Sequence, residues 1–338
     1  MKNFFLTIIA VITAISSLLS SPEAMAELRN KGDISGFAES VSAVKELPQL
    51  HADENGDFTV LQFSDTHFTT GRSFSDVSLL VKMKSQTEKY NPDLVVVTGD
   101  MINDGDAGLF NKAYVLRTVA EMFEDMGQYW SYVPGNNDGL NYGSSADVVA
   151  YLSQYDHCLV ADLPEISGGC QYSIDIYSKD EMTHSMIFID TMDYDDEDPD
   201  HKYGYVHEDQ VEWCKKEIER KKELDSDVTI SVFLHENTPD FFRAAQYGEA
   251  YKKGYAKISK QDEIYNIPKN QPLDDVFRNS GCVGLLTMGH KHPLAAECCY
   301  YEGIYYQITP QTVLGSTLIT IHTKAENTKE MYDFEYVV

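Results

Sequence analysis

Seven side chains of metal-binding type follow directly after apolar segments of the chain: Asp65, His67, Asp100, Asn136, His235, His290 and His292. Carboxylate, imidazole and amide oxygen are borderline ligands that suit Zn, Mn or Fe. Alternate residues of an extended chain face the same side. Both ligand residues of the Asp-x-His segment can therefore point into one site, and so can both histidines of the His-x-His segment. These residue types at this spacing indicate a metal centre.

Each of these segments also has an ordinary structural explanation when it is taken alone. Gly99-Asp100 can be a turn, and the stretch 135–138 (Gly-Asn-Asn-Asp) can be a tight turn because Asn tolerates left-handed backbone. His235 can be a buried histidine of the core. All five segments nevertheless follow apolar strands, and three have a glycine beside them. The combination favours one metal site over five unrelated turns.

The residues that must position these ligands alternate between strand and helix patterns. Residues 94–97 (Leu-Val-Val-Val) are typical of a buried parallel strand. Strands are predicted at 58–63 and 129–133 as well, and helices at 75–90 and 108–126. This β-α-β-α-β order predicts a parallel sheet with right-handed crossovers, and ligands bind at the carboxyl edge of such a sheet.

The second half of the chain predicts a second set of strands. They are expected at 172–177, 186–190, 228–234 and 283–288, with a helix at 207–222, and the strands at 304–309, 316–322 and 332–338 would close a second sheet. Residues 237–272 are rich in Tyr, Lys and Pro. They are either a lid over the site or a surface excursion.

The first residues have the pattern of a secretory signal peptide. Lys2 precedes an apolar run over 4–19, and the small residues of Ala24-Met25-Ala26 follow it. A membrane anchor is the alternative, but the run is shorter than the roughly 20 apolar residues that a span needs. We therefore expect a signal peptide over 1–26, a lead-in segment over 27–57, one folded domain over 58–338, secretion, and no stable membrane span.

Charge and cysteine content limit the partners and the redox chemistry. The formal net charge is −27, which excludes nucleic acid as a partner because such a surface repels polyanions. The chain has six cysteines, an even number behind a signal peptide, which permits disulfides. Cys158–Cys170 is the pair that local spacing favours, and reduced buried thiols are the alternative.

The order and type of the ligand segments resemble the calcineurin-like metallophosphoesterases. The family pattern is Asp-x-His, Gly-Asp, Gly-Asn-His-Asp/Glu, a lone His and Gly-His-x-His, and each block has a counterpart between residues 58 and 338. The resemblance implies an α/β fold, a two-sheet β-sandwich flanked by helices, for a metallophosphoesterase domain over 58–338. It also implies two metal ions at the carboxyl edge of the sheets.

The resemblance further implies a role for each ligand. It assigns Asp65, His67 and His292 to one ion, Asn136, His235 and His290 to the other, and Asp100 to both. In such sites the ions lie roughly 3.5–4 Å apart, and a metal-activated water attacks phosphorus. The expected function is hydrolysis of small phosphate esters, chiefly monoesters, with a phosphodiesterase of the same fold as an alternative.

A further stretch indicates a branch of the family. Residues 203–206 (Tyr-Gly-Tyr-Val), followed by Gln210 and Trp213, are similar to the Tyr-Gly-Trp-Ile…Gln…Trp signature of a purple-acid-phosphatase-related group. True purple acid phosphatases lack the first-block histidine, which is His67 here, and carry tyrosine where this chain has Asn103. Without that tyrosine the charge-transfer colour is expected to be absent.

The third block departs from the family pattern at Asn137, where the family has a histidine that contacts phosphate and can protonate the leaving group. Asparagine donates hydrogen bonds but cannot act as an acid near neutral pH. Asp138, His157, His184 and His201 are the candidate replacements for this acid. A second hypothesis therefore stays open, in which a non-catalytic protein keeps the metals and binds phosphorylated ligands.

Overall fold

The computed structural model describes residues 34–40, 45–103, 109–139, 144–163, 165–193, 204–252 and 267–338. The signal peptide predicted over residues 1–26 lies outside them. Within the described part of the chain, no helix is long and apolar enough to cross a membrane.

One sheet has five strands and carries the first three ligand segments. Its order is β13 (Tyr332–Val337), β12 (Ser316–His322), β2 (Asp57–Phe63), β3 (Leu94–Thr98) and β4 (Trp130–Val133). The last three strands run parallel, and the crossovers between them are α4 (Phe74–Tyr90) and α5 (Leu109–Met126). The predicted β-α-β-α-β alternation and its parallel sheet are therefore confirmed.

The limits of these elements follow from local chemistry. All five residues of β3 are buried, as expected for an apolar strand that is covered on both faces. Helix α4 begins after Ser73, whose side chain accepts a hydrogen bond from the backbone N–H of Asp76. It ends at Asn91, which adopts a left-handed conformation (φ 44°) immediately before Pro92.

The second sheet has eight strands and carries the remaining ligand segments. Its order is β1 (Leu50–His51), β5 (Gln171–Ser178), β6 (Glu181–Ile189), β7 (Thr229–Phe233), β9 (Val283–Met288), β11 (Ile304–Ile308), β10 (Glu297–Tyr301) and β8 (Glu249–Ala250). The four strands from β6 to β11 in this order run parallel to their neighbours, whereas the β5–β6, β10–β11 and β8–β10 pairs are antiparallel.

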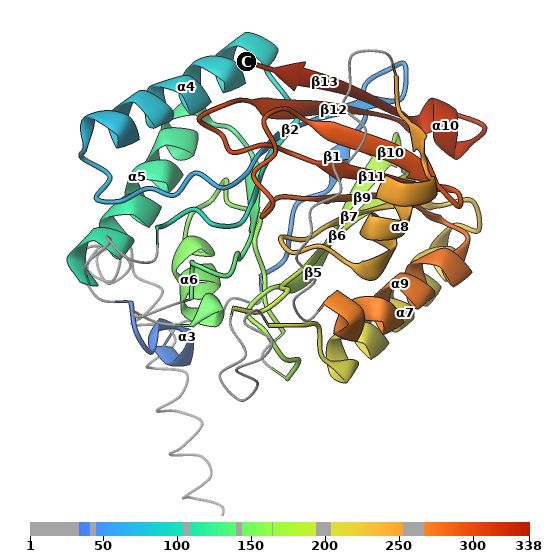
Figure 1. Cartoon of the computed structure of the whole chain (residues 1–338), viewed down its shortest axis with the longest axis horizontal. Coiled ribbons are helices and arrows are strands. Elements are labelled where there is room, and N and C mark those ends of the chain that lie inside the picture. Colours follow the sequence, from blue (N-terminus) through green and yellow to red (C-terminus); the bar gives the residue numbers. More distant parts are fainter. Residues whose placement is uncertain are drawn as a thin grey trace, which may run out of the picture.

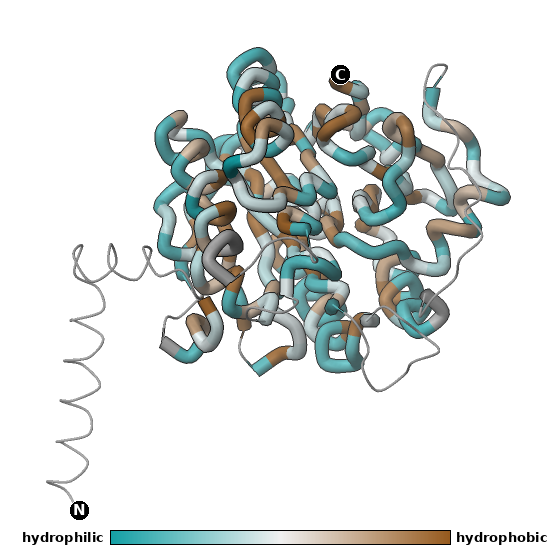
Figure 2. Tube along the Cα trace, turned by 60° about the vertical axis from the view of Figure 1, so that its left-hand side comes forward, coloured by the Kyte–Doolittle hydropathy of each residue, from teal (hydrophilic) through white to brown (hydrophobic). Residues whose placement is uncertain are grey.

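The two sheets pack against each other and helices cover their outer faces (Figure 1). One hydrophobic cluster joins strands of both sheets with α4 and α5, and it includes Phe63, Val97, Phe188 and Leu285. A second cluster packs the eight-stranded sheet against α7 (Glu208–Leu224), α8 (Pro239–Tyr247) and α9 (Gln271–Ser280). Figure 2 shows brown, hydrophobic segments in the interior of the molecule and teal, hydrophilic segments on its outer turns. The architecture is the predicted α/β sandwich of two mixed sheets flanked by helices.

Several expectations need correction. The strands at 316–322 and 332–338 do not belong to the second sheet, because β12 pairs with β2 and places both of them in the first. Helices α6 (Ser145–Leu152), α8 and α9 were not expected, nor were α10 (Thr328–Met331) and the 3-10 turn η1 (Ile267–Asn270). The lead-in segment contains α3 (Phe37–Ser40), a short helix whose Phe37 ring packs 5.5 Å from that of Tyr151.

The region 237–272, for which a lid and a surface excursion were the two alternatives, is partly built into the fold. It contains α8, whose Phe241 and Ala244 are buried against the eight-stranded sheet, and the short edge strand β8. Residues 253–266 lie outside the described part of the chain. The cysteine pairing is also wrong, because all six thiols are free and Cys158 and Cys170 are both buried.

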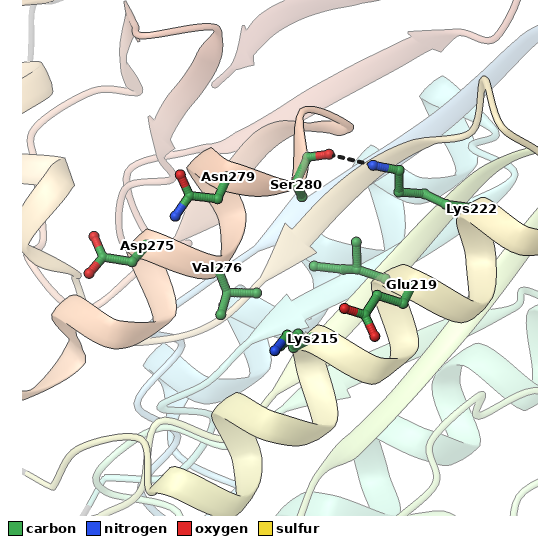
Figure 3. Close-up of a pocket in the computed structure, with 8 residues that line it drawn as sticks. Lys215, Glu219, Lys222, Asp275, Val276, Asn279 and Ser280 are labelled. Atoms are coloured by element: carbon green, nitrogen blue, oxygen red, sulfur yellow. Dashed lines mark hydrogen bonds between the residues drawn. The ribbon is translucent and has the colours of Figure 1, made fainter.

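A groove of about 350 Å³ runs between α7 and α9 on the outside of the eight-stranded sheet (Figure 3). Lys222 Nζ donates a hydrogen bond to the carbonyl oxygen of Ser280 across it, at 2.8 Å. These two residues lie near the amino ends of β7 and β9, and none of the seven predicted ligands lines the groove. The groove is therefore remote from the strand ends that carry the predicted chemistry.

Candidate metal centre

The five ligand segments meet where the carboxyl ends of the parallel strands of both sheets come together. Gly99, between β3 and Asp100, permits this close approach because it has a positive φ (79°) and no side chain. A Cβ atom there would lie 2.5 Å from His235 Nδ1 and 2.7 Å from the Cα of Gly135. The glycines beside the ligands therefore allow three strand ends to touch.

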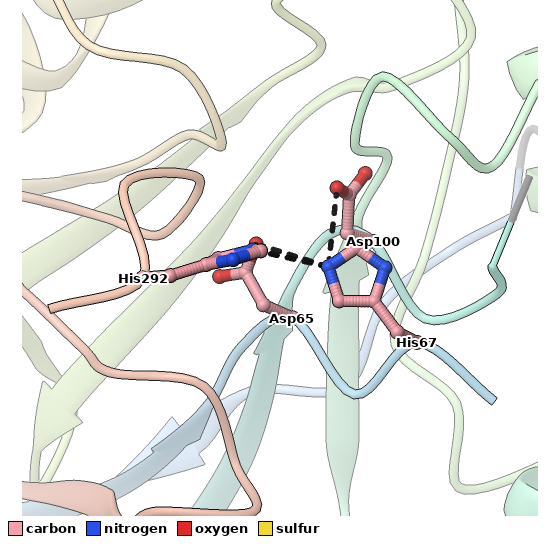
Figure 4. A group of neighbouring side chains, drawn as sticks. All are labelled: Asp65, His67, Asp100 and His292. Carbon is pink, nitrogen blue, oxygen red and sulfur yellow. Dashed lines mark hydrogen bonds and ion pairs between the residues drawn. The ribbon is translucent and has the colours of Figure 1, made fainter. Parts of the chain in front are cut away.

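Asp65, His67, Asp100 and His292 form a first group of converging side chains (Figure 4). His292 Nε2 lies 3.0 Å from Asp65 Oδ1 and 3.0 Å from His67 Nε2, and one ligand atom from each of the four lies within 4.8 Å of the others. The group opens to solvent on one side, since 20% of the His67 side chain and 39% of the His292 side chain are exposed.

Asp100, His235 and His290 form a second group beside the first. His235 Nε2 lies 3.4 Å from Asp100 Oδ1 and 3.3 Å from His290 Nδ1. Asn136 joins this group, because its Oδ1 lies 3.2 Å from the same His235 nitrogen. His235 is fully buried and Asn136 is nearly so. The structure thus brings all seven predicted ligands together.

Asp100 presents one carboxylate oxygen to each group. Its Oδ2 lies 3.7 Å from His67 Nε2, and its Oδ1 lies 3.4 Å from His235 Nε2. The side chain is 3% exposed. A carboxylate in this position can serve two cations at once.

The ligand residues have unusual backbone conformations. Nine non-glycine residues in the described part of the chain have positive φ, and five of them are Asp65, His67, Asp100, His290 and His292. Such conformations are uncommon for residues with a Cβ atom and cluster at functional sites. The backbone is therefore held in a strained arrangement that directs these five side chains inward.

Neighbouring groups orient the ligands. His235 Nδ1 lies 2.8 Å from the carbonyl oxygen of Thr98, which fixes the ring so that Nε2 faces Asp100. Ser64 Oγ lies 2.6 Å from Asp65 Oδ2, and the backbone N–H of His290 donates to the same carboxylate at 3.0 Å. Contacts of this kind set the ring orientation and basicity of metal ligands.

The charges of the centre fit a pair of cations. Burial opposes the imidazolium form of His235, but the adjacent Asp100 raises the pKa of His235 to about 10. The carboxylate therefore stabilises positive charge at this position. Burial lowers the pKa of His290 to about 3, so this imidazole keeps a free lone pair. Glu236 adds a further carboxyl group, 3% exposed, whose Oε1 has no hydrogen-bond partner, and burial raises the pKa of this carboxyl well above its usual value. The ionised form of a buried carboxyl group is costly without a positive partner, and cations in the adjacent groups would offset that cost.

Asn137 turns toward Asp100. Its side-chain Nδ2 donates to Asp100 Oδ2 at 2.5 Å, and its backbone N–H donates to Asp100 Oδ1 at 2.9 Å. Asp138 is fully buried, and its carboxylate accepts hydrogen bonds from the backbone N–H groups of Ile102 and Gly135. One carboxylate oxygen of Asp138 thus closes the turn that carries Asn136, and the other ties this turn to the segment that follows Asp100.

The other candidate acids lie elsewhere or outside the described residues. His184 is buried within β6, where it contacts Thr229 and Ser231 at the amino end of β7. His157 pairs with Glu124 at the amino end of β4, with its Nδ1 2.8 Å from the carboxylate. His201 lies outside the described part of the chain. Neither described histidine is at the ligand edge of the sheets.

The branch motif supports the loop beside the centre. Tyr203 lies outside the described residues, but the backbone N–H of Gly204 donates to the carbonyl oxygen of Asp193 at 2.9 Å. Gln210 is fully buried, and its Nε2 donates to the carbonyl oxygen of Asp190 at the end of β6. These residues hold the segment that follows β6. That segment lies beside Glu236, because the backbone N–H of Glu236 donates a hydrogen bond to Thr191 Oγ1.

We expect Gly289→Ala to disrupt the centre while leaving most of the fold intact. A Cβ atom at this position would lie 1.8 Å from Ser64 Oγ and 2.5 Å from Asp65 Oδ2, so Asp65 would have to move. Overpacking of this kind costs about 1–3 kcal/mol. Bound metal per chain and thermal unfolding measure the two effects.

Gly127→Ala is the matched control for this prediction. Its Cβ atom would meet nothing within 4 Å, although its positive φ (64°) carries a backbone cost of about 1–2 kcal/mol. We expect it to lose stability but to keep its metal. Equal metal content in Gly289→Ala and in the unaltered protein would show that the close packing of Gly289 against Asp65 does not matter for the centre.

Comparison with known proteins places this fold and site in a family. The calcineurin-like phosphoesterase family matches residues 58–301. Since this span is more than half of the chain, the protein belongs to the calcineurin-like phosphoesterases. No curated protein matches the chain significantly in sequence.

Solved structures align with this chain at low sequence identity. A dimetal phosphatase from Danio rerio aligns with a TM-score of 0.56 and 12% identity, over 83% of this chain and 99% of that one. A putative 5'-nucleotidase from Staphylococcus aureus aligns with a TM-score of 0.47 and 14% identity, over 83% of this chain and 53% of that one. A purple acid phosphatase from yellow lupin seeds aligns with a TM-score of 0.44 and 12% identity, over 81% and 50%.

Proposed function

We propose that the protein is a secreted phosphoesterase that holds two metal ions and hydrolyses phosphate esters, chiefly monoesters. One observation carries the proposal: donor atoms from five strand ends converge in two groups that share the two oxygens of Asp100. Side chains that only stabilised a loop would not need to be arranged in two groups around one shared carboxylate. The Danio rerio structure of the same fold is described as a dimetal phosphatase, which agrees with the proposal.

In this proposal each ion takes ligands from both sheets. One ion would be held by Asp65, His67, His292 and Asp100, and the other by Asn136, His235, His290 and Asp100. Zn, Mn and Fe all suit this mixed oxygen and nitrogen donor set. When bound, two such ions activate a water molecule and offset the charge that develops on the phosphoryl oxygens. They would also reverse locally the repulsion between a phosphate and a chain of net charge −27.

The chain's own residues would orient the ligands and hold the substrate near the open side of the first group. His67 and His292 line that side, since both are partly exposed. The predicted signal peptide over residues 1–26 supports secretion. Gly204 and Gln210 support a place in the purple-acid-phosphatase-related branch, and Asn103, in place of that group's tyrosine, supports a colourless centre.

A second candidate function is metal-dependent binding of a phosphorylated ligand without turnover. It is favoured by Asn137, which cannot supply a proton and whose amide is bonded to Asp100. Asp138, the adjacent candidate acid, has both carboxylate oxygens engaged by backbone N–H groups. The two functions differ in one observable, namely whether a phosphate ester is cleaved.

The test is a panel of esters with the metal-loaded protein. We expect cleavage of p-nitrophenyl phosphate, slower cleavage of an alkyl phosphate, and weaker activity on bis-p-nitrophenyl phosphate. His235→Ala should abolish this activity, because the ring contacts Asp100, Asn136 and His290. His322→Ala is the matched control, since that histidine pairs with Asp57 and Asp333 on β2 and β13 and should leave activity unchanged.

The outcomes separate the two candidate functions. Cleavage that disappears with a chelator and with His235→Ala supports the enzyme. Two bound ions with phosphate binding but no cleavage of any ester supports the binding protein. Absence of bound metal in the loaded protein contradicts both.

A further inference from the structure

A chain of buried polar side chains crosses the interface between the two sheets directly below the candidate metal centre. We call this chain the inter-sheet network. All its members are fully buried: Gln62, Thr98, Thr287, Gln307, Thr309 and Thr317. The cluster around them is apolar, so the polar atoms of these six residues must find their hydrogen-bond partners among one another or in the backbone.

The network joins the sheets through Gln62. On β2 of the five-stranded sheet, Gln62 Nε2 donates to Thr98 Oγ1 on β3 at 2.9 Å. Across the interface, Thr287 Oγ1 on β9 of the eight-stranded sheet donates to Gln62 Oε1 at 2.6 Å. Both polar atoms of the Gln62 amide are therefore engaged, one within its own sheet and one with the opposite sheet.

The far side of the network closes back onto the first sheet. Thr287 Oγ1 also contacts Gln307 on β11, and Gln307 Nε2 donates to Thr309 Oγ1 and to Thr317 Oγ1, each at 3.0 Å. Because Thr317 belongs to β12, the network links the sheets a second time. Every side chain in it has at least one partner.

The network lies two or three residues before the ligands on both sheets. Gln62 precedes Asp65 by three residues, Thr98 precedes Asp100 by two, and Thr287 precedes His290 by three. The Thr98 carbonyl oxygen is also the group that orients His235. A shift in this network would therefore reach ligands of both candidate ions.

The two metal groups depend on how the sheets sit against each other. His292 comes from the eight-stranded sheet and meets Asp65 and His67 from the five-stranded sheet, while His235 and His290 meet Asp100 in the same way. A side-to-side slip of one sheet would open both groups at once. Apolar packing is non-directional and tolerates small slips, whereas a satisfied buried polar network specifies one arrangement.

We propose that the Gln62–Thr287 hydrogen bond is a positioning contact. It sets the spacing between the metal ligands of the five-stranded sheet and those of the eight-stranded sheet. Gln62 and Thr287 touch neither ion nor substrate in this role. Their effect passes through Asp65, Asp100 and His290. The inference rests on the proposed metal centre, since it assigns the network to the assembly of that centre.

The experiment compares metal binding in variants that remove the contact with little change of volume. Gln62→Met and Thr287→Val each delete one partner, and Thr287→Ser keeps the hydroxyl. We expect each deletion to weaken Mn²⁺ binding by about 10–100-fold, as for other residues that orient metal ligands. Each single variant also loses a second contact, Gln62–Thr98 in one case and Thr287–Gln307 in the other. The double variant should therefore be weaker than either single variant, but by less than the product of the two separate effects, because the Gln62–Thr287 contact is lost in all three.

Tyr332→Phe is the matched control. The Tyr332 hydroxyl is buried and accepts a hydrogen bond from Ser231 Oγ at 3.2 Å, which also joins the two sheets, but near the amino end of β7. We expect this variant to change Mn²⁺ affinity by no more than about twofold. The electron paramagnetic resonance signal of a coupled Mn²⁺ pair gives a second readout, and it should be lost in Thr287→Val and restored in Thr287→Ser.

Two results would overturn the inference. One is an unchanged affinity and coupled signal in Thr287→Val, and the other is a Thr287→Ser variant as impaired as Thr287→Val. Thermal unfolding of each variant shows whether it folds, and a variant that does not fold is left out of the comparison. The test then rests on Thr287→Val, which changes the side-chain volume least. If the unaltered protein holds no metal pair, the proposed function itself fails, which is a different outcome from a pair that persists in all variants.

Discussion

Asp100→Asn is expected to release both metal ions and to abolish ester hydrolysis. Asp100 is the residue that both groups share, with Oδ2 facing His67 and Oδ1 facing His235. An amide keeps the shape but removes the negative charge, and its NH₂ group cannot act as a ligand. Removing one partner of a buried charge pair costs about 3–5 kcal/mol, which corresponds to roughly 10²–10⁴-fold in affinity.

The measurement is metal content per chain after dialysis against a weak chelator, with hydrolysis of p-nitrophenyl phosphate on the same sample. Asp162→Asn is the matched control. Asp162 is another buried aspartate, with one carboxylate oxygen that has no partner, and it belongs to neither metal group. The control should keep both ions. An Asp100→Asn protein that retains turnover would contradict the bridging role.

Asn137→His is expected to raise turnover most on esters with poor leaving groups. The imidazole would restore a group that can donate a proton, and general acid catalysis contributes typically about 10²–10⁴-fold. An alkyl phosphate needs this proton because its alkoxide leaves poorly, whereas p-nitrophenolate leaves without help. The expected result is a large gain on the alkyl ester and a small one on the p-nitrophenyl ester.

The substitution also removes the hydrogen bond between Asn137 Nδ2 and Asp100 Oδ2. Metal content therefore has to be measured on the same preparation, so that a loss of metal is not mistaken for a failure of the acid. Asn137→Gln keeps an amide without an acid and should leave the preference among esters unchanged. Equal gains on both esters would argue against the missing-acid explanation.

The sequence was sufficient to predict the ligand-bearing strands, because apolar runs bounded by glycine and polar residues are strong signals. Residues 58–63, 94–97 and 283–288 correspond to β2, β3 and β9 within one residue at each end. The helix at 75–90 was also predictable, since Asn91-Pro92 stops it. These elements depend on local patterns, which a sequence displays directly.

The helices α8 and α9 were hidden by proline. Pro239 and Pro272 suggest loops, but each stands in the first turn of its helix, where a missing N–H group costs nothing. The sheet that β12 and β13 join was also not predictable. It depends on pairing between β12 and β2, which are separated by more than 250 residues, and no local pattern reports such pairing.

The site was predictable in its residue types but not in its contacts. Five strand ends with ligand residues could be recognised, whereas the positive φ angles of Asp65 and Asp100 could not. The hydrogen bond from the Asn137 side chain to Asp100 was not predictable either. Glu236 was missed because one glutamate after a histidine carries no signal until its burial is known.

The most direct test of the two-metal centre is anomalous diffraction from crystals of the protein loaded with Zn²⁺ or Mn²⁺. We predict two peaks of anomalous density, roughly 3.5–4 Å apart, with the Asp100 carboxylate between them. One peak should lie among Asp65, His67 and His292, and the other among Asn136, His235 and His290. A single peak, or peaks only outside these two groups, would contradict the proposed centre.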